Sequence, residues 1–359
     1  MPDERGYSEE KFLKTLRILA PGTPLREGLE NVLRARTGGL IVVGDTPEVL
    51  KLCEGGFRID ADATPANLYE LSKMDGAIIL TSDARKIVYV NVQLVPDPTV
   101  PSFETGIRHR TAERVARQTG ELVIAISQRR NIISLYRGPI KYILRDISVI
   151  LNKANQAIQT LEKYKAVLDR ASLNLSALEF EDLVTLVDVC SVLQRAEMVS
   201  RIVREIERYI SELGTEGRLI SMQLDELRTN VEEEGLAIVR DYLVPTDGLT
   251  PEQARARIAA LSPEDLLDLA TVAQQLGYGQ NPNLDLSVSP RGVRILQRIP
   301  RLPTVVVDNL VGHFGALQRI LAATIDQLDD VEGIGEVRAR AIKDGLRRLR
   351  DQVLLDRHI

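Results

Sequence analysis

The chain has 359 residues, of which 44% are hydrophobic and 27% are charged, and its formal net charge is −5. Because one hydrophobic core rarely extends over so many residues, this length predicts two or three domains. The negative net charge excludes a global field that draws the protein to nucleic acid, so any such binding requires a local basic patch. Trp is absent and aromatic residues make up only 4%, which argues against stacking platforms for single-stranded nucleic acid.

The N-terminal residues and the cysteines indicate a cellular compartment. The chain begins MPDERGYSEE, without an apolar signal region, and no apolar run approaches the length of a membrane span. Cys53 and Cys190 lie far apart in apolar segments, which predicts small buried side chains rather than a disulfide framework or a metal site. We therefore expect a cytoplasmic protein with no membrane partner.

Helical and strand patterns alternate in residues 1–138, which we assign to an N-terminal α/β domain with a mixed sheet flanked by helices. Short apolar runs bounded by glycine or polar residues predict strands at 39–44, 76–80, 87–92, 122–126 and 131–136. Amphipathic patterns predict helices at 9–18, 23–36 and 111–119.

Strand patterns disappear in residues 139–286, which we assign to an all-α helical spine or linker domain. Apolar residues recur there at helical spacing, as in Ile150, Ala154, Ile158, Leu161 and Leu168. The pattern continues through 180–213 and 217–242, and the polar segment 277–290 indicates a connecting loop. Such a spine is typical of a structural or oligomerising role, and we find no chemistry in it.

Residues 287–359 are predicted to form a small all-α domain that contains a glycine-rich turn. Val331-Glu332-Gly333-Ile334-Gly335 lies between two helical patterns and resembles the helix-hairpin-helix DNA-binding motif. Glycines let the backbone approach a phosphate, and the following helix N-terminus directs free N–H groups at it. The expected DNA-binding residues are Gly333, Ile334, Gly335, Arg338, Arg340 and Lys343. The alternative is a glycine pair that only ends a helix.

A second, degenerate copy of this hairpin precedes the first one. Ile299-Pro300-Arg301-Leu302-Pro303 occupies the hairpin position, with prolines in place of the glycines. Proline removes both flexibility and an N–H donor. The resemblance implies that the two copies form a compact unit of five helices.

The segment from Gly106 to Ala112 contains the triplet Arg108-His109-Arg110, with the only histidine among the first 300 residues. Arginine presents a planar fork of donors that can grip phosphate oxygens in pairs, so the triplet predicts an anion site. Asp75, which precedes Gly76 and Ala77 at a strand edge, is suited to hold a divalent metal near a phosphate. Taken alone, the triplet is also compatible with a surface charge cluster, and Asp-Gly is simply a turn signal.

Together these two motifs resemble the diadenylate cyclase family, which joins two ATP molecules into cyclic di-AMP. Ser127, at the end of an expected strand, also fits the family pattern. The resemblance implies that Asp75 binds Mg²⁺ or Mn²⁺ and activates the attacking hydroxyl, and that Arg108, His109 and Arg110 act on the phosphates. It further implies that the ATP-binding residues are Gly76, Ala77, Leu94, Thr111, Ser127, Arg129 and Arg130. One departure is Ile107, where the family commonly has Thr, because it removes a possible hydroxyl contact.

The order of the three segments resembles the bacterial DNA integrity scanning protein family over essentially the whole chain. That resemblance implies nucleotidyltransferase activity on ATP, preferential binding of branched or junction DNA that suppresses cyclisation, and a nucleoid-associated location. It also implies a homo-octamer in which cyclase domains face each other, because the product has two linkages related by a two-fold axis.

Three alternatives remain open at this point. The chain could be a DNA-binding scaffold with a decayed nucleotide site, to which Ile107 lends some support. It could be a phosphoesterase or nuclease, although such enzymes usually gather several carboxylates or histidines around their metals. It could also be a structural oligomer, but that interpretation leaves the Arg-His-Arg triplet unexplained.

Overall fold

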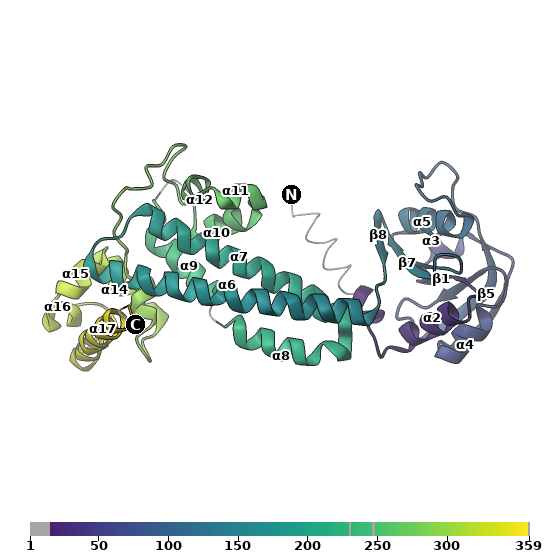
Figure 1. Cartoon of the computed structure of the whole chain (residues 1–359), viewed down its shortest axis with the longest axis horizontal. Coiled ribbons are helices and arrows are strands. Elements are labelled where there is room, and N and C mark those ends of the chain that lie inside the picture. Colours follow the sequence, from purple (N-terminus) through teal and green to yellow (C-terminus); the bar gives the residue numbers. More distant parts are fainter. Residues whose placement is uncertain (1–14, 230, 246–247, 358–359) are drawn as a thin grey trace. The chain divides into compact units, whose positions relative to one another are not determined.

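The structure, a computed structural model, describes residues 15–229, 231–245 and 248–357 (Figure 1). Its internal contacts group the chain into two units, one of Met1–Gln156 with Ile206–Met222 and the other of Ala157–Glu205 with Gln223–Ile359. Residues 15–18 are helical, and the rest of the helix expected at 9–18 lies outside the described residues. Within the described part, no helix is both long and apolar enough to cross a membrane.

The first unit contains an eight-stranded mixed sheet, as predicted. Its strand order is β2-β5-β4-β1-β6-β7-β8, and β3 pairs with β5 off this path. β1 and β4 run parallel, and all other pairs are antiparallel. The strands are β1 (Gly39–Val43), β2 (Cys53–Glu54), β3 (Phe57–Asp62), β4 (Ala77–Leu80), β5 (Lys86–Leu94), β6 (Leu122–Ser127), β7 (Ile132–Arg137) and β8 (Ile140–Ile143).

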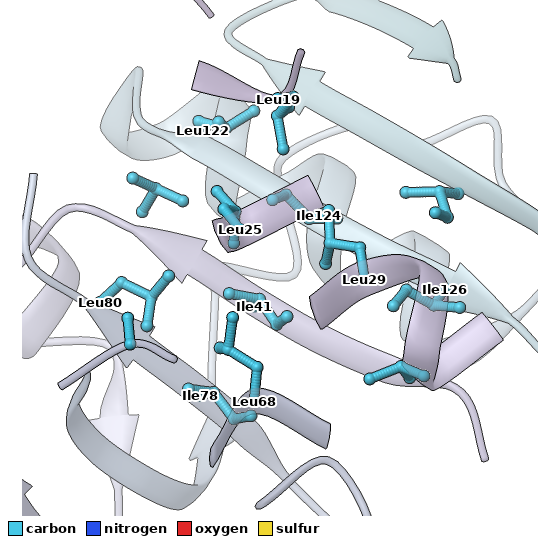
Figure 2. Close-up of a cluster of buried hydrophobic side chains, with 14 of the residues drawn as sticks. Leu19, Leu25, Leu29, Ile41, Leu68, Ile78, Leu80, Leu122, Ile124 and Ile126 are labelled. Atoms are coloured by element: carbon cyan, nitrogen blue, oxygen red, sulfur yellow. The ribbon is translucent and has the colours of Figure 1, made fainter. Parts of the chain in front are cut away.

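Helices cover both faces of this sheet. Successive strand residues point to opposite sides, so each strand contributes side chains to both layers. One cluster contains Ile41 and Ile78 of the sheet with Leu29 and Leu68 of two helices, and Figure 2 shows these side chains converging. The opposite cluster contains Val42 and Ile79 with Val115 and other helical residues. Burial on both faces explains why the central strands appear in the sequence as continuous apolar runs. The helices are α2 (Pro24–Arg34), α3 (Pro47–Leu50), α4 (Pro65–Leu71) and α5 (Ile107–Thr119).

Several boundaries in this unit differ from expectation. β2, β3 and β8 were not predicted, and β8 lies where only helices were expected. Residues of β3 are mostly exposed, so this strand carries no apolar run. α5 begins at Ile107 rather than at residue 111, because Gly106 is its N-cap and the charged triplet forms its first turn. Cys53 is only half-buried, whereas Cys190 is buried as expected.

The predicted helical stripe is confirmed in α6 (Ile147–Glu181), where the side chains from Ile150 to Leu168 named above are all buried. Further helices follow α6, and residues 182–185 separate it from the next helix. They are α7 (Leu186–Leu213), the 3-10 helix η1 (Gly214–Gly217), α8 (Arg218–Leu227), α9 (Val231–Tyr242), α10 (Pro251–Ala260), α11 (Pro263–Leu267) and α12 (Leu269–Gln275).

Five helices form the described part of the C-terminal segment, as the paired hairpins imply, and they share one hydrophobic cluster. They are α13 (Val293–Gln297), α14 (Thr304–Phe314), α15 (Leu317–Ala322), α16 (Ile325–Asp329) and α17 (Glu336–Asp356). The Asp241 carboxylate accepts the N–H groups of residues 292–294, at 2.6–3.0 Å, and so caps the short α13. The buried Arg294 donates to Glu179 at 2.5 Å, which ties α13 to α6 inside the second unit.

Candidate functional site

Three strand ends meet at one edge of the sheet in the first unit. In the parallel pair, Leu40 of β1 lies opposite Ala77 of β4, so both strands start at this edge. In the antiparallel pair, Gly39 lies opposite Ile126, so β6 ends there. The sheet therefore brings Asp75-Gly76 and Ser127, which are about 50 residues apart in sequence, to the same edge.

Gly76 lets the backbone after Asp75 pass close to the neighbouring strand. Its φ is 132°, and a Cβ atom there would lie 2.8 Å from the carbonyl carbon of Asn91 in β5. A side chain at this position would therefore require the β5 backbone to move. Asp75 itself is exposed, whereas Ala77 is completely buried. Leu94 is 8% exposed and belongs to the same core cluster as Ala77, so it offers little free surface to a ligand.

The first turn of α5 carries the charged triplet to this edge. Gly106 caps the helix without a side-chain hydrogen bond, so its first N–H groups are open to an anion. The guanidinium of Arg108 lies against Gly38, just before β1: a Cβ at Gly38 would collide with its Nη1 and lie 3.3 Å from the Ile126 carbonyl oxygen. Arg108 therefore extends to the junction of β1 and β6, close to the start of β4.

The turn after β6 contributes further cations. The Arg130 N–H donates to Ser127 Oγ at 3.2 Å, and its guanidinium lies 3.4 Å from Thr105 Oγ1. Arg110 donates through Nε to the Glu104 carbonyl oxygen at 3.3 Å. Thr111 is half-buried. The four arginines of the edge are exposed and pair with no carboxylate within the described residues: Arg108, Arg110, Arg129 and Arg130.

His109 differs from its charged neighbours because its side chain points inward. The residue is 7% exposed, and its Nδ1 lies 3.0 Å from the hydroxyl oxygen of Tyr136 in β7. That hydroxyl donates to Glu104 at 2.8 Å, and Lys141 forms an ion pair with the same carboxylate. Burial lowers the pKa of His109, and the charge of Glu104 opposes this shift only in part. These surroundings do not favour the direct phosphate contact expected from the sequence.

The described residues contain no group of three or more histidine, cysteine or acidic side chains that could hold a metal ion. Asp75 is therefore not part of a ligand cluster of that size. Mg²⁺ is commonly bound by one or two carboxylates together with substrate phosphates, rather than by a complete protein cage. Asp75 beside the exposed arginines fits a metal that arrives with a nucleotide, and it does not fit a permanent structural metal site.

The C-terminal hairpin has the expected backbone. Gly333 adopts a φ of 82°, and Gly335 caps α17 without a side-chain hydrogen bond. Arg338 is exposed and donates to the Gly333 carbonyl oxygen, and the exposed Arg340 pairs with Glu336. Two of the expected DNA-binding residues have mainly internal contacts, because Ile334 is 7% exposed and Lys343 donates to the Leu321 carbonyl oxygen at 3.2 Å.

The degenerate hairpin lies next to the glycine hairpin. Pro303 caps α14 in the position that Gly335 has in α17, and Arg301 adopts a φ of 63°. A groove of about 570 Å³ lies between the two hairpins, with Arg301 on one side and Arg338 on the other. The two hairpins thus present one continuous surface with an arginine on each side.

Comparison with known proteins divides the chain into three matching segments. Residues 26–140 match the family described as DisA bacterial checkpoint controller nucleotide-binding, and residues 144–284 match the linker region of the same controller. Residues 316–345 match the helix-hairpin-helix motif. The DNA integrity scanning protein DisA of Carboxydothermus hydrogenoformans is 63% identical over 345 residues, which cover 96% of this chain and 98% of that protein. The chain belongs to the DisA family.

Other DisA proteins are similar to nearly the same extent. The protein of Symbiobacterium thermophilum is 62% identical over 97% of this chain and 98% of its own length. That of Clostridium perfringens is 58% identical over 99% of this chain and its full length. The family recognised from the motifs is therefore confirmed, whereas the domain borders after residues 138 and 286 and the roles of individual DisA site residues stay predictions.

Sequence reasoning missed four residues that shape the site. Gly38 receives Arg108, Thr105 contacts Arg130, and Glu104 with Tyr136 holds His109. The paired glycines at 38 and 39, just before an apolar run, could have indicated a close approach to the start of the strand. Nothing in the local sequence distinguishes Glu104 or Tyr136.

Proposed function

We propose that the chain is a diadenylate cyclase that condenses two ATP molecules into cyclic di-AMP and two pyrophosphates. The observation that carries this proposal is the meeting of Asp75, Ser127 and Arg108 at one sheet edge, beside the open N-terminus of α5. A carboxylate, a hydroxyl and unpaired guanidiniums at a helix N-terminus form an anion site with one proton acceptor.

The residues of this edge would position the nucleotides and neutralise the charge of their phosphates, and these two effects dominate catalysis of nucleotidyl transfer. Arg108 and Arg110 would bind phosphate oxygens. Arg129 and Arg130 would provide further positive charge for the same phosphates. Thr111 and Ser127 would donate hydroxyl hydrogen bonds to phosphate oxygens. Ile107, which is 84% exposed, supplies no such donor and leaves an apolar side chain at the mouth of the site.

Asp75 would accept the proton of the attacking 3′-hydroxyl and, with the phosphates, hold Mg²⁺ or Mn²⁺. When bound, such an ion neutralises phosphate charge and lowers the pKa of the attacking hydroxyl. Gly76 lets the backbone next to Asp75 lie against Asn91 of β5, where a side chain would collide. Gly76 and Ala77 would also let the nucleoside lie close to the backbone, and Leu94 would support them from the core cluster that it shares with Ala77.

Two cyclase domains have to cooperate, because each linkage in the product joins the nucleotide held by one domain to that held by the other. A two-fold arrangement of facing domains satisfies this requirement, so the active form is an even homo-oligomer, for which we propose an octamer. The exposed edge with its arginines is the surface that would face the second domain.

The C-terminal unit would bind DNA through phosphate contacts at Gly333, Gly335, Arg338 and Arg340. Contacts of this kind position the protein without reading sequence, and their affinity falls steeply with salt. We further propose that branched or junction DNA binds best and slows cyclisation. A titration of junction DNA against the cyclisation rate tests this part, and binding without any change in rate would contradict it.

Asp75→Asn tests the assignment of the site. The variant keeps the size of the side chain but cannot accept a proton or bind a metal strongly, so we expect at least about a 100-fold loss of cyclisation. Asp45→Asn is the matched control, because Asp45 follows β1 at the opposite edge of the sheet. Wild-type output from Asp75→Asn protein supplied with ATP and Mn²⁺ would exclude Asp75 as base or metal ligand.

The remaining alternative is a DNA-binding scaffold with a decayed nucleotide site. Ile107 favours it only weakly, because the unpaired arginines and Asp75 are retained at the edge. Absence of ATP consumption together with retained DNA binding would favour this alternative.

A further inference from the structure

The buried side of the charged triplet is a chain of hydrogen bonds that the proposed chemistry does not use. It runs from His109 Nδ1 to the Tyr136 hydroxyl at 3.0 Å, and from that hydroxyl to Glu104 at 2.8 Å. Tyr136 is 1% exposed, and Glu104 is 9% exposed. Lys141 of β8 completes the chain through its ion pair with Glu104. Residues of β7, β8 and the loop before α5 are therefore linked to the first turn of α5 through His109.

The direction of each hydrogen bond follows from chemistry. Glu104 is buried, which by itself raises the pKa of its carboxyl, but hydrogen bonds from Lys141 and Tyr136 lower it on balance and favour the carboxylate. A carboxylate only accepts, so the single hydroxyl hydrogen of Tyr136 points to Glu104. The oxygen of Tyr136 is then left to accept, and the hydrogen between Tyr136 and His109 resides on Nδ1.

This assignment leaves Nε2 of a neutral His109 as a bare acceptor. Nε2 is buried as well and has no hydrogen-bond partner among the residues that the structure describes. A bare acceptor has no attraction for phosphate oxygens, which also accept. His109 is therefore poorly suited to grip a phosphate, although it lies between two arginines that are exposed.

Glu104 is linked to those arginines through its backbone as well as its side chain. Its carbonyl oxygen accepts from Arg110 Nε at 3.3 Å, and the hydroxyl of the next residue, Thr105, lies 3.4 Å from Arg130. A shift of Glu104 would therefore displace two cations of the edge together. The side chain of His109 fixes the helix turn from which Arg108 and Arg110 project.

We propose that His109 is a positioning residue, and that the Glu104–Tyr136–His109 chain holds the α5 N-terminus so that its arginines meet the nucleotide phosphates. This inference rests on the proposed nucleotide site. It assigns the function of His109 to Nδ1, whereas direct action on a phosphate or on a leaving group would require Nε2.

Two substitutions separate the ring nitrogens. In His109→Asn the side-chain amide lies near the position of Nδ1 and can still donate to Tyr136, whereas in His109→Gln it lies near the position of Nε2. Binding is measured on the full-length protein with α,β-methylene-ATP, which cannot lose pyrophosphate from its α-phosphorus. We expect His109→Gln to bind this probe about tenfold more weakly than His109→Asn, because it loses the anchoring hydrogen bond. The opposite order would overturn the proposal.

Tyr136→Phe removes only the hydroxyl that joins His109 to Glu104, and we expect about a tenfold loss of affinity for the probe. Tyr142→Phe is the matched control, because it removes a hydroxyl of the same unit that donates to Glu212. Unchanged affinity in Tyr136→Phe, with only a lower melting temperature, would show a purely structural role and contradict the proposal.

The tautomer provides a readout that does not depend on activity. The chain has 3 histidines, so solid-state NMR of full-length protein labelled with ¹⁵N-histidine resolves few ring signals. We expect His109 to be neutral with hydrogen on Nδ1, and its shifts to change in Tyr136→Phe. A hydrogen on Nε2 would overturn the inference even if the protein makes cyclic di-AMP. The expected tautomer in a protein that makes none would instead contradict only the proposed function.

Discussion

Gly38 and the guanidinium of Arg108 occupy adjoining space, so that a Cβ atom at residue 38 would collide with Nη1 of the arginine. Gly38 also adopts a φ of 75°, which L side chains rarely adopt. The start of β1 is thus shaped to receive an arginine from a helix that begins almost 70 residues later in the chain. Gly38 leaves room there for the guanidinium of Arg108, which pairs with no carboxylate of the described residues.

We predict that Gly38→Ala weakens nucleotide binding by displacing Arg108. One misplaced charge-assisted contact corresponds to about a tenfold loss of affinity, and the backbone conformation adds about 1 kcal/mol of instability. Gly55→Ala is the control, because Gly55 has a similar φ of 64° but nothing lies within 4 Å of an added Cβ. Calorimetric titration with α,β-methylene-ATP compares the two, and equal affinities would contradict this role of Gly38.

We predict that His109 makes the folded protein less stable as the pH falls below about 6.5. Burial lowers the pKa of His109, with Arg130, Lys141 and Arg108 adding to the effect and Glu104 opposing it. The unfolded chain then binds a proton near pH 6.5 that the folded protein binds only at lower pH, so stability is lost as the pH decreases. Urea unfolding of wild type and His109→Asn at pH 7.5 and 5.5 measures this, and equal losses in both proteins would argue against it.

Part of this fold and of its candidate site could be predicted from the sequence, and part could not. The strands at β1 and β6 were predictable because both faces of the sheet are covered, which turns each strand into a run of apolar residues. β3 was missed because its side chains are largely exposed, and its place depends on pairing with β5. Asp75 and Arg108 were singled out from local motifs together with the resemblance to the cyclase family, and the fold brings both to the same end of the strands.

The inward orientation of His109 was not predictable from the same motif. It depends on Tyr136, which lies 27 residues further along the chain, and on Glu104. A histidine between two arginines in sequence suggests a shared role on a phosphate, but the helix turns its side chain away from theirs, because successive residues are about 100° apart. Only the fold reveals that separation.

Glu336 opposes DNA binding in the proposed hairpin, and we predict that Glu336→Gln raises the affinity for DNA. Its carboxylate lies in the first turn of α17, where a DNA phosphate would approach, and it pairs with Arg340. Removing a charge at a helix terminus should change the affinity by about two- to fivefold. Asp351→Asn, a change of equal charge further along α17, is the control. Fluorescence anisotropy with junction DNA measures both, and a weaker affinity in Glu336→Gln would contradict the prediction.

Arg294 is predicted to be essential for the stability of the second unit. It pairs with Glu179, and the exposed fractions of the two side chains are 3% and 0%. Arg294→Met leaves the buried Glu179 carboxylate without its cation, so we expect a loss of about 3–5 kcal/mol. Lys165→Met, which breaks the more exposed pair with Asp169 in α6, should cost about 1 kcal/mol or less. Denaturant unfolding compares the two, and similar losses would argue against a special role of the buried pair.

We propose that the arginine-lined edge joins two ATP molecules. This proposal is tested most directly by supplying the wild-type protein with ATP and Mn²⁺ and identifying the products by chromatography and mass spectrometry. We expect cyclic di-AMP together with two pyrophosphates for each cyclic product. Unconsumed ATP, or conversion to ADP and phosphate without any cyclic dinucleotide, would contradict it.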